Sequence, residues 1–512
     1  MPEHLRSLIV ILILASVVFS FAKIPLCGAA TTREDFARRR NLWFAVTLIA
    51  FLAHEFWIYI VVVGVLLAFA NGREPNRLAL YLTLLFAVPP ISAAIGGMGV
   101  MQHFFEIDYL RLLALVILLP KWWTLRRQPD VQRFGATTTD KFLVVYLVLR
   151  FLLRFQYDSA TDAFRYGFYY FTDAFLPYYV ASRTARNIGQ LREAMAMFVL
   201  ASMLLACIGV FEFIKQWLLY SPLAEALSVG WNYGDYLGRG EGLRALASTG
   251  QPIVLGFVMV VALGFYGFLW QDLSTRWGLL GLVVLVAGLL APLSRGPWLG
   301  AMLLLVSYVA VGTRPIKQFV IIGIVFATLS AVLILFQIGG EFIQYLPFVG
   351  TVDAENVTYR ERLLDNSLTL IGRNPFFGDP YYYLTPEMEE MRQGQGIIDV
   401  VNTYVAIALS SGLIGLTLFI GIFLGPLVAV SRNMRTLSNK RADYFRLGQS
   451  LLATLVAVLF MISTVSSILA IETVSWIVAG LAMAYVGIVG KARFEEKSKV
   501  PYSSELGRGR DY

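Results

Sequence analysis

The sequence predicts an all-α membrane protein: a polytopic bundle of about 12–15 transmembrane helices with a large external loop that contains amphipathic helices. Two observations support this fold class. Of the 512 residues, 57% are hydrophobic and only 15% are charged, whereas soluble domains carry about 25% charged residues. The apolar residues also form long blocks without two-residue alternation. In lipid such blocks are expected to be helices, because a helix satisfies its own backbone hydrogen bonds.

Apolar blocks recur along the whole chain, and each crossing of the hydrocarbon core needs about 20 apolar residues. Candidate helices begin near Leu5, Leu42, Leu78, Tyr109, Phe142, Phe164, Met195, Pro252, Leu279, Trp298, Phe319, Val401, Leu451 and Thr473. The block 42–70 is too long for one simple crossing, so a break within it is expected. The block 5–22 predicts a retained helix, because the apolar core of a signal peptide is only about 7–15 residues.

Positive charges between the blocks predict the orientation, because Lys and Arg gather in cytoplasmic loops. Basic segments at 121–133, 183–192, 314–317, 432–446 and 491–499 are therefore expected to be cytoplasmic. Arg38, Arg39 and Arg40 disagree, since they would be external if the N-terminus is cytoplasmic. Either the first helix does not span, or the block 42–70 crosses twice.

This orientation divides the chain into six parts. They are N-terminal transmembrane helices at 1–219, an external loop at 220–250, central transmembrane helices at 251–338, a large external (periplasmic) loop at 339–400, C-terminal transmembrane helices at 401–490 and a cytoplasmic tail at 491–512. Basic cytoplasmic loops explain the net charge of +8, and no nucleic-acid partner is expected. Two cysteines and three histidines exclude a cysteine-based or histidine-rich metal site, and no cofactor is predicted.

The large external loop is expected to hold an ordered helix. Thr358 with Glu361 has the spacing of a capping box, and Gly372 with Pro375 is a stop signal. A helix of about four turns is expected between them. On its wheel Val357, Leu364, Leu368 and Ile371 share one face with Arg360, while Arg362, Asp365 and Thr369 lie on the opposite face. Arg360 is then either an inward anion site or a partner of Glu355 or Glu361.

A short external turn, Ser294-Arg295-Gly296-Pro297-Trp298, connects two hydrophobic helices. An arginine at membrane depth costs about 2.5–3.5 kcal/mol on insertion scales, so it needs a partner or a function. On the turn alone, an arginine extending to the interface beside Trp298 is the simpler interpretation.

A second segment, 242–252, precedes the helix that starts at Pro252 and contains Arg244. A cation beside a helix N-terminus suits phosphate. Ordinary capping of the helix by Ser248 or Thr249 is the simpler alternative.

Other charged and aromatic residues lie within the predicted helices. They are Arg150 and Arg154 with Asp173, Glu212 with Lys215, His54 with Glu55, and the aromatic clusters 166–171, 178–179 and 381–383. We interpret the first two sets as structural ion pairs. The third is an intramembrane pair and so a functional site by default, although it is far in sequence from the external loops. The aromatic clusters could stack on sugars, but interfacial belts explain most such residues.

The second half of the chain, roughly residues 240–430, resembles the O-antigen ligase and O-antigen polymerase (Wzy-like) superfamily of bacterial membrane glycosyltransferases. Three motifs carry the resemblance. The turn Ser294-Arg295-Gly296 opens a hydrophobic helix, the run 360–378 leads from an arginine to Pro-x-x-Gly, and Asn402-Thr-Tyr404 precedes Ser-Gly412-Leu-Ile-Gly415. The order of the motifs and the long loop are also similar to the family.

The resemblance implies transfer of a glycan from undecaprenyl diphosphate at the external face of the inner membrane, without a metal. It implies catalytic roles for Arg295 and Arg360, and substrate-binding roles for Arg244, Arg362, Asn402 and Tyr404. The ligases have a histidine directly before the asparagine, whereas this chain has Val401. This departure favours a polymerase of exopolysaccharide or O-antigen repeat units over a ligase. A general base is then sought among Asp399, Asp379 and Asp353, and the choice stays open.

The implied partners are the lipid-linked oligosaccharide, membrane lipids, and polysaccharide export or chain-length proteins. A rival function is a lipid-linked oligosaccharide flippase, and a third is a scaffold subunit of an export complex. Transporters often contain internal repeats and interrupted helices near mid-membrane. No repeat is evident here and the polar residues gather toward the external face, which favours an enzyme.

Overall fold

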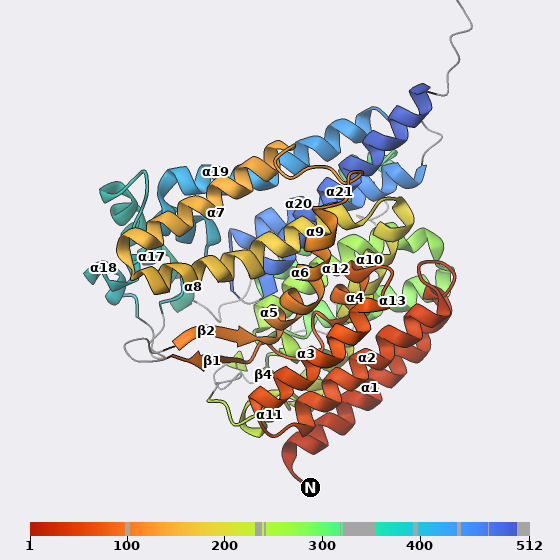
Figure 1. Cartoon of the computed structure of the whole chain (residues 1–512), viewed down its shortest axis with the longest axis horizontal. Coiled ribbons are helices and arrows are strands. Elements are labelled where there is room, and N and C mark those ends of the chain that lie inside the picture. Colours follow the sequence, from red (N-terminus) through yellow and green to blue (C-terminus); the bar gives the residue numbers. More distant parts are fainter. Residues whose placement is uncertain are drawn as a thin grey trace, which may run out of the picture.

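The computed structural model of the chain is an almost entirely helical bundle (Figure 1). It describes residues 1–97, 103–230, 238–239, 242–317, 319–320, 354–392, 398–437, 442–468 and 470–498. The predicted all-α polytopic bundle is confirmed. Within the described residues, six helices are long and apolar enough to span a membrane by themselves. This number is below the predicted 12–15 because several other helices are shorter or interrupted.

The helices of the N-terminal half pack side by side along the bundle. They are α1 (Glu3–Leu26), α2 (Arg33–Leu52), α3 (Phe56–Gly72), α4 (Arg77–Leu84), α5 (Tyr109–Leu113), α6 (Leu119–Leu125), α7 (Thr138–Tyr157), α8 (Ala160–Tyr170), α9 (Leu176–Thr184) and α10 (Ile188–Lys215). Short π-helical segments at Ala114–Leu118 and Phe171–Phe175 join α5 to α6 and α8 to α9. Each of these two trios therefore forms one continuous rod.

The central and C-terminal helices complete the bundle. They are α11 (Ser221–Ala226), α12 (Pro252–Leu269), α13 (Thr275–Leu290), α14 (Arg295–Val311), α17 (Ala354–Arg373), α18 (Pro386–Glu389), α19 (Thr403–Arg435), α20 (Ala442–Ile462) and α21 (Ala470–Ser498). The only strands in the described residues form two antiparallel hairpins. These are β1 (Ser92–Gly96) with β2 (His103–Asp108), and β3 (Gly238–Arg239) with β4 (Gly242–Leu243).

The basic loops meet at one end of the bundle. Arg186 pairs with Asp130, Lys491 Nζ donates to the Asp130 carbonyl at 3.4 Å, and Arg192 lies 3.5 Å from the Asp443 carboxylate. These contacts join the loops after α6, α9 and α19 and the end of α21. By the positive-inside rule we expect this end to be cytoplasmic, and on that basis we call it the cytoplasmic end and the opposite end external.

The N-terminus lies at the external end, which resolves the disagreement at Arg38–Arg40. The Trp217 indole beyond α10 donates to the Glu3 carboxylate at 3.1 Å. The block 42–70 breaks at His54, where φ is +58°, so α2 and α3 cross in opposite directions. Arg39 then lies at the cytoplasmic end, fully buried between Glu74 at 2.5 Å and Glu193 at 2.8 Å. Because α1 starts at the external end, the arginines at the start of α2 lie at the cytoplasmic end and agree with the positive-inside rule.

The break also corrects the interpretation of His54 and Glu55. Both residues are exposed at the external end rather than inside the membrane. His54 Nδ1 lies 2.7 Å from the Leu52 carbonyl, and Ser228 donates to the His54 carbonyl at 3.2 Å. These contacts close a turn between two helices, so the pair is not an intramembrane site.

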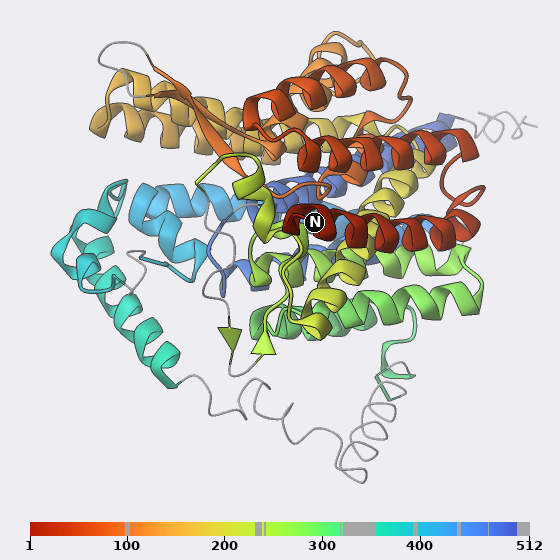
Figure 2. The ribbon, with the colours of Figure 1, turned by 90° about the horizontal axis from the view of Figure 1, so that it is seen from below.

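The external end carries the β1–β2 hairpin, α11 and the helices of the large loop (Figure 1). Figure 2 shows α17 leaning away from the bundle at this end. Residues 318 and 321–353, which include the predicted helix near Phe319 in part, lie outside the described residues. The end of the bundle that holds both external loops therefore holds the candidate site.

Candidate active site

Glu212, near the external end of α10, anchors the segment that carries Arg244. Its carboxylate is fully buried and accepts hydrogen bonds from the backbone N–H groups of Leu219 at 3.0 Å, Leu246 at 3.0 Å and Ala247 at 2.7 Å. The predicted ion pair with Lys215 is wrong: Lys215 is exposed, and no pair joins the two residues in the structure. Glu212 instead accepts hydrogen bonds from three backbone N–H groups.

The helix-terminus interpretation is wrong for two backbone N–H groups of the segment before α12, which are not available to a ligand. Leu246 and Ala247 already donate to Glu212. The capping alternative is wrong as well, because Ser248 donates to the Phe86 carbonyl at 2.5 Å and Thr249 to the Leu246 carbonyl at 2.7 Å. Both side chains tie the segment to its surroundings.

Arg244 clamps the turn between α13 and α14. Its Nε donates to the Pro292 carbonyl at 3.1 Å, and its Nη2 donates to Ser294 Oγ at 2.9 Å. Ser294 is buried and its hydroxyl donates to the same Pro292 carbonyl at 3.1 Å. Arg295 follows in the chain as the half-buried first residue of α14. Two arginines that are far apart in sequence are therefore held in one turn.

The connection between α20 and α21 packs directly against this turn. A Cβ added to Gly296 would lie 2.9 Å from Thr464 Oγ1, so the turn and the connection approach too closely for a larger residue. On its other side the connection holds the start of α19, because the N–H and hydroxyl of Thr403 both donate to the Val465 carbonyl, at 3.2 and 2.8 Å. The connection thus joins the turn at Ser294 to the motif at Asn402.

Asp399 belongs to the same assembly. Its exposed side chain accepts a short hydrogen bond from the Ser466 hydroxyl, which also donates to the Val400 carbonyl at 3.0 Å. Its backbone carbonyl accepts from the Tyr359 hydroxyl of α17 at 3.3 Å. The α20–α21 connection therefore contacts both the Asp399 carboxylate, through Ser466, and the turn that carries Arg295, through Thr464.

Asn402 and Tyr404 both shape the start of α19. The Asn402 side-chain oxygen accepts from the N–H groups of Tyr404 at 3.0 Å and Val405 at 3.3 Å, and so caps the helix. The Tyr404 hydroxyl donates to the Leu459 carbonyl of α20 at 2.8 Å. Both side chains are half-buried, and both stabilise the local fold at the start of α19.

Two further motif segments lock together at a break in α19. Gly412 has φ +65° and ψ −173° inside this helix, and Gly378 in the preceding loop has φ +64°. A Cβ at Gly412 would lie 2.1 Å from the Phe376 carbonyl oxygen, so only glycine fits. The loop replaces the lost helical bonds, because Leu413 N–H donates to the Pro375 carbonyl at 2.8 Å. The Pro-x-x-Gly and Ser-Gly motifs are thus one structural unit.

Asp379 is fixed by this unit rather than by the arginine turn. Its N–H donates to the Leu409 carbonyl at 2.7 Å, and its carboxylate accepts from the Tyr381 N–H at 2.8 Å. Asp353 lies outside the described residues. Of the three candidate bases, Asp399 is the one that the described contacts bring to the Ser294 assembly.

The predicted wheel of α17 is wrong. Leu363, Ser367 and Leu370 form the buried stripe, whereas Leu364 is 46% and Leu368 is 58% exposed. The stripe is shifted because α17 packs on a small separate core with Met388 and Met391. Arg360 and Arg362 are both exposed, so Arg360 lies with exposed leucines rather than pointing into the bundle.

The ends of α17 give mixed outcomes. The predicted capping box is wrong, because the helix begins at Ala354 and so contains Thr358 in its interior. The predicted stop is confirmed, because the helix ends at Arg373, before Pro375. Arg360 has no ion pair with Glu361 among the described side chains, and the side chain of Glu355 is not among them.

A sequence model of the family described as O-antigen ligase matches residues 280–420. This match supports membership of the chain in the O-antigen ligase and polymerase family. The matched range includes the Ser294 turn, the helix α17 and the break in α19, which are the parts that the described contacts assemble. No curated protein matches the chain. The family indicates a membrane glycosyltransferase-type enzyme that acts on lipid-linked oligosaccharides in polysaccharide synthesis.

The charged residues of the N-terminal half form different ion pairs from those predicted. Asp173 pairs with Arg111, which donates to it from Nη2 at 2.9 Å and from Nε at 3.1 Å. Arg150 lies 3.9 Å from Glu472 of α21, and Arg154 lies 3.4 Å from Asp158. The sequence did not indicate these partners because two of them, Arg111 and Glu472, come from helices that only tertiary packing brings beside α7 and α8.

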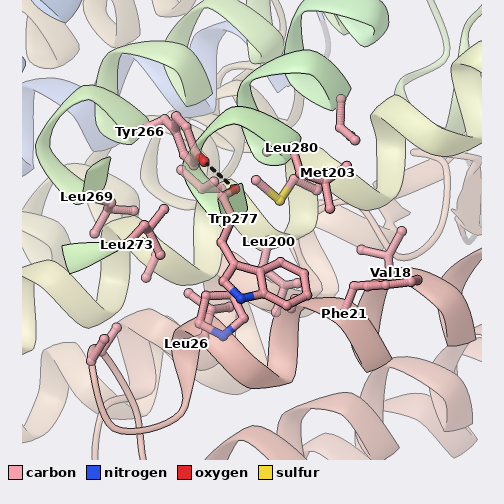
Figure 3. A pocket seen from close by; sticks show the side chains of 18 of the residues that line it. Val18, Phe21, Leu26, Leu200, Met203, Tyr266, Leu269, Leu273, Trp277 and Leu280 are labelled. Carbon is pink, nitrogen blue, oxygen red and sulfur yellow. Dashed lines mark hydrogen bonds between the residues drawn. The ribbon is translucent and has the colours of Figure 1, made fainter. Parts of the chain in front are cut away.

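An apolar groove of about 380 Å³ lies between α1, α10, α12 and α13 (Figure 3). Val18, Phe21, Met203 and Trp277 are among the residues that line it, and the Tyr266 hydroxyl donates to the Gly278 carbonyl at 2.7 Å. The groove lies along the middle of α10 and the ends of α1 and α12, toward the cytoplasmic end. Its lining includes none of Arg244, Ser294 and Arg295, so it is separate from the turn that carries Arg295.

Proposed function

We propose that this family member polymerises undecaprenyl-diphosphate-linked oligosaccharide repeat units, of an exopolysaccharide or O-antigen, at the external face of the bacterial inner membrane. The observation that carries the proposal is the turn in which Arg244 holds Ser294 next to Arg295. This turn contacts the α20–α21 connection, whose Ser466 binds Asp399. Cations for a leaving group and a carboxylate for an acceptor therefore belong to one assembly.

The proposed reaction is a single displacement. An acceptor hydroxyl attacks the anomeric carbon of the lipid-linked glycan from the side opposite the leaving group, so the configuration at that carbon is inverted. The bond between that carbon and the diphosphate oxygen breaks, and its electron pair leaves with the diphosphate. Asp399 takes the hydroxyl proton. Arg295 and Arg244 stabilise the negative charge that grows on the diphosphate, as preorganised donors do in other transfer reactions.

Arg360 is proposed to act from the exposed face of α17. Leu364 and Leu368 lie on that face with Arg360, and a face with both leucines and an arginine suits a polyprenyl diphosphate. A guanidinium offers bidentate hydrogen bonds to phosphate oxygens, which a lysine does not. Arg362, Asn402 and Tyr404 remain proposed contributors to substrate binding, the last two through the shape of the α19 start.

The ligase is the second candidate, because the matching family model carries that description. The residue before Asn402 is Val401, which has no titratable group, so a base at the ligase position is missing. Asp399 lies close by in sequence and accepts a hydrogen bond from Ser466 of the α20–α21 connection. This arrangement favours the polymerase, in which the acceptor is the sugar of another repeat unit.

The proposal is tested by the polysaccharide profile of a deletion strain on a gel. Loss of a polymerase leaves a single repeat on the lipid acceptor, and the wild-type gene restores the ladder. Free polymer beside unmodified lipid A core would instead identify a ligase. Lipid-linked units retained on the cytoplasmic side would identify a flippase. Either of the last two profiles would overturn the proposed polymerase.

A further inference from the structure

Two tyrosine clusters that are far apart in sequence meet at the external end of the bundle. Tyr166 comes from α8, and Tyr381 precedes the short 3₁₀ helix Tyr382–Leu384 of the large loop. The guanidinium carbon of Arg154 lies 4.1 Å from the ring centre of Tyr166 and 5.7 Å from that of Tyr381. Arg154 therefore joins the membrane helices to the loop.

Asp158 contacts both Arg154 and Tyr381 and so holds them together. Its carboxylate pairs with Arg154 at 3.4 Å and accepts a short hydrogen bond from the Tyr381 hydroxyl. The Asp158 side chain is only 1% exposed and that of Arg154 is 15% exposed. The hydrogen bond to Asp158 raises the pKa of Tyr381 to about 12, so the phenol stays a donor at any physiological pH. The Arg154–Asp158 ion pair is thus buried next to the rings of Tyr166 and Tyr381.

Tyr383 forms the exposed side of the cluster. Its ring centre lies 5.6 Å from that of Tyr381, and the residue is 36% exposed. Burial raises the pKa of Tyr383. The charge of Arg154 opposes this increase, whereas Tyr166 and Asp158 add to it. An accessible aromatic ring therefore lies beside a fixed carboxylate–guanidinium pair.

The charge balance of the neighbourhood limits what this cluster can bind. Arg154 is paired with Asp158, and the next arginine inward, Arg150, is paired with Glu472 while lying 4.4 Å from the ring of Tyr170. Because each cation has a carboxylate partner, no excess positive charge favours a diphosphate here. Aromatic faces with a few fixed polar groups instead suit a polyhydroxylated ligand.

We infer that Tyr166, Tyr381 and Tyr383, with Arg154 and Asp158, form a glycan-binding subsite for the oligosaccharide part of the substrate. The inference rests on the proposed function only for the identity of the glycan as a repeat unit. The Tyr381 turn is fastened to α19 through the bond from Asp379 N–H to Leu409, and the same helix begins at Asn402 beside the arginine turn. One helix therefore connects sugar recognition to the proposed chemistry.

The test measures binding without turnover. The probe is the repeat-unit oligosaccharide released by mild acid from the lipid carrier of the deletion strain, titrated into the full-length protein in nanodiscs. Tyr383→Ala and Tyr381→Ala should each weaken binding about tenfold, the effect of losing about 1.4 kcal/mol. Arg295→Ala should bind the lipid-free glycan as the wild type does, because its proposed partner is the diphosphate.

Tyr157→Ala is the matched control. Tyr157 ends α7 one residue before Asp158 and is 42% exposed, and no ring or cation contact of its side chain occurs within the described residues. If the tyrosines only formed an interfacial belt, Tyr157→Ala and Tyr383→Ala would behave alike. The correct fold of each variant is checked by thermal unfolding in detergent.

Wild-type affinity in Tyr383→Ala and Tyr381→Ala, equal losses in Tyr157→Ala, or no binding by the wild-type protein would each overturn the subsite. None of these results bears on the gel profile of the deletion strain, which tests the proposed function separately. In a polymerisation assay the two tyrosine variants should raise the acceptor concentration at half-maximal rate and retain most of kcat. A structural role would instead lower the amount of folded protein.

Discussion

Arg244 and Ser294 are joined by a hydrogen bond of 2.9 Å between Nη2 and Oγ, although they are 50 residues apart in sequence. Both side chains also donate to the Pro292 carbonyl, each at 3.1 Å. The Pro292 carbonyl accepts from Arg244 and from Ser294, and Arg244 also donates to Ser294. These three hydrogen bonds fix the backbone at the start of α14. Arg295 is the next residue, so the position of its side chain depends on Arg244.

The coupling of Arg244 and Ser294 predicts non-additive effects. Arg244→Ala and Ser294→Ala should each lower the polymerisation rate, and the double variant should lose less than the two losses combined. Contacting residues show interaction energies of about 0.5–3 kcal/mol in such cycles. Arg244→Ala with Ser228→Ala is the control pair, because Ser228 bonds the His54 carbonyl instead, and its effects should add. Additive losses in the first cycle would contradict the clamp.

Arg295→Ala and Arg360→Ala should each abolish polymer while leaving expression unchanged. The loss of one charged donor to a leaving group costs about 3–4 kcal/mol, or roughly a hundred- to a thousandfold in rate. The lysine variants should recover little, because lysine cannot bind a diphosphate in a bidentate way. Arg362→Ala is the control on α17 and should be milder. Full polymer yield from Arg295→Ala would refute the proposed mechanism.

Asp399→Asn should lower the rate at least about a hundredfold, since a general base contributes roughly 10²–10⁴. The asparagine oxygen can still accept the Ser466 hydroxyl, so the fold should be retained. Asp379→Asn should keep most of the rate, because Asp379 holds the Tyr381 turn. The measurement is the initial rate with purified lipid-linked units in nanodiscs. The reverse order of the two losses would show that the base is assigned wrongly.

Glu212→Gln should destabilise the protein by about 1–3 kcal/mol. One amide oxygen cannot serve both carboxylate positions, so at least one of the buried N–H groups of Leu219, Leu246 and Ala247 is left unpaired. Lys215→Ala is the control and should be neutral, since Lys215 is exposed. Thermal unfolding in detergent measures both variants. Equal destabilisation by Glu212→Gln and Lys215→Ala would instead support the predicted Glu212–Lys215 ion pair.

The sidedness of the N-terminal helices can be tested by cysteine labelling. After Cys27 and Cys207 are replaced by serine, Glu55→Cys should react with an impermeant thiol reagent on cells with a permeabilised outer membrane. Glu34→Cys and Arg435→Cys should not react, because they lie at the cytoplasmic end. All three positions are exposed. Labelling of Glu34→Cys from outside would mean that α1 does not enter from the external side.

The fold class was predictable because it depends on local composition. Long apolar blocks must become helices in lipid, and the distribution of Lys and Arg predicts an orientation independently of what the helices contact. The end of α17 before Pro375 was predictable for the same reason, since proline cannot continue a helix. The Ser294 turn and the Asn402 motif were also identified from short local patterns, and the family match covers both.

The partners of the charged residues were not predictable from local sequence. Glu212 binds backbone N–H groups of a segment more than thirty residues away rather than Lys215, and Asp173 pairs with Arg111 rather than Arg150 or Arg154. The buried face of α17 is set by Met388 and Met391 rather than by its most apolar stripe. In each case the decisive atoms come from a different element.

The sequence by itself determined that this chain is a helical membrane protein, and its short motifs indicated the O-antigen ligase and polymerase family, whose model matches residues 280–420. Only the tertiary structure decided which of these residues meet: Arg244 with the Ser294 turn, Asp399 with Ser466, and Tyr381 with Asp158. The physical reason is the range of the forces. Apolar transfer and charge sidedness act on each segment alone, whereas hydrogen bonds and ion pairs act over a few ångströms and depend on how helices distant in sequence pack.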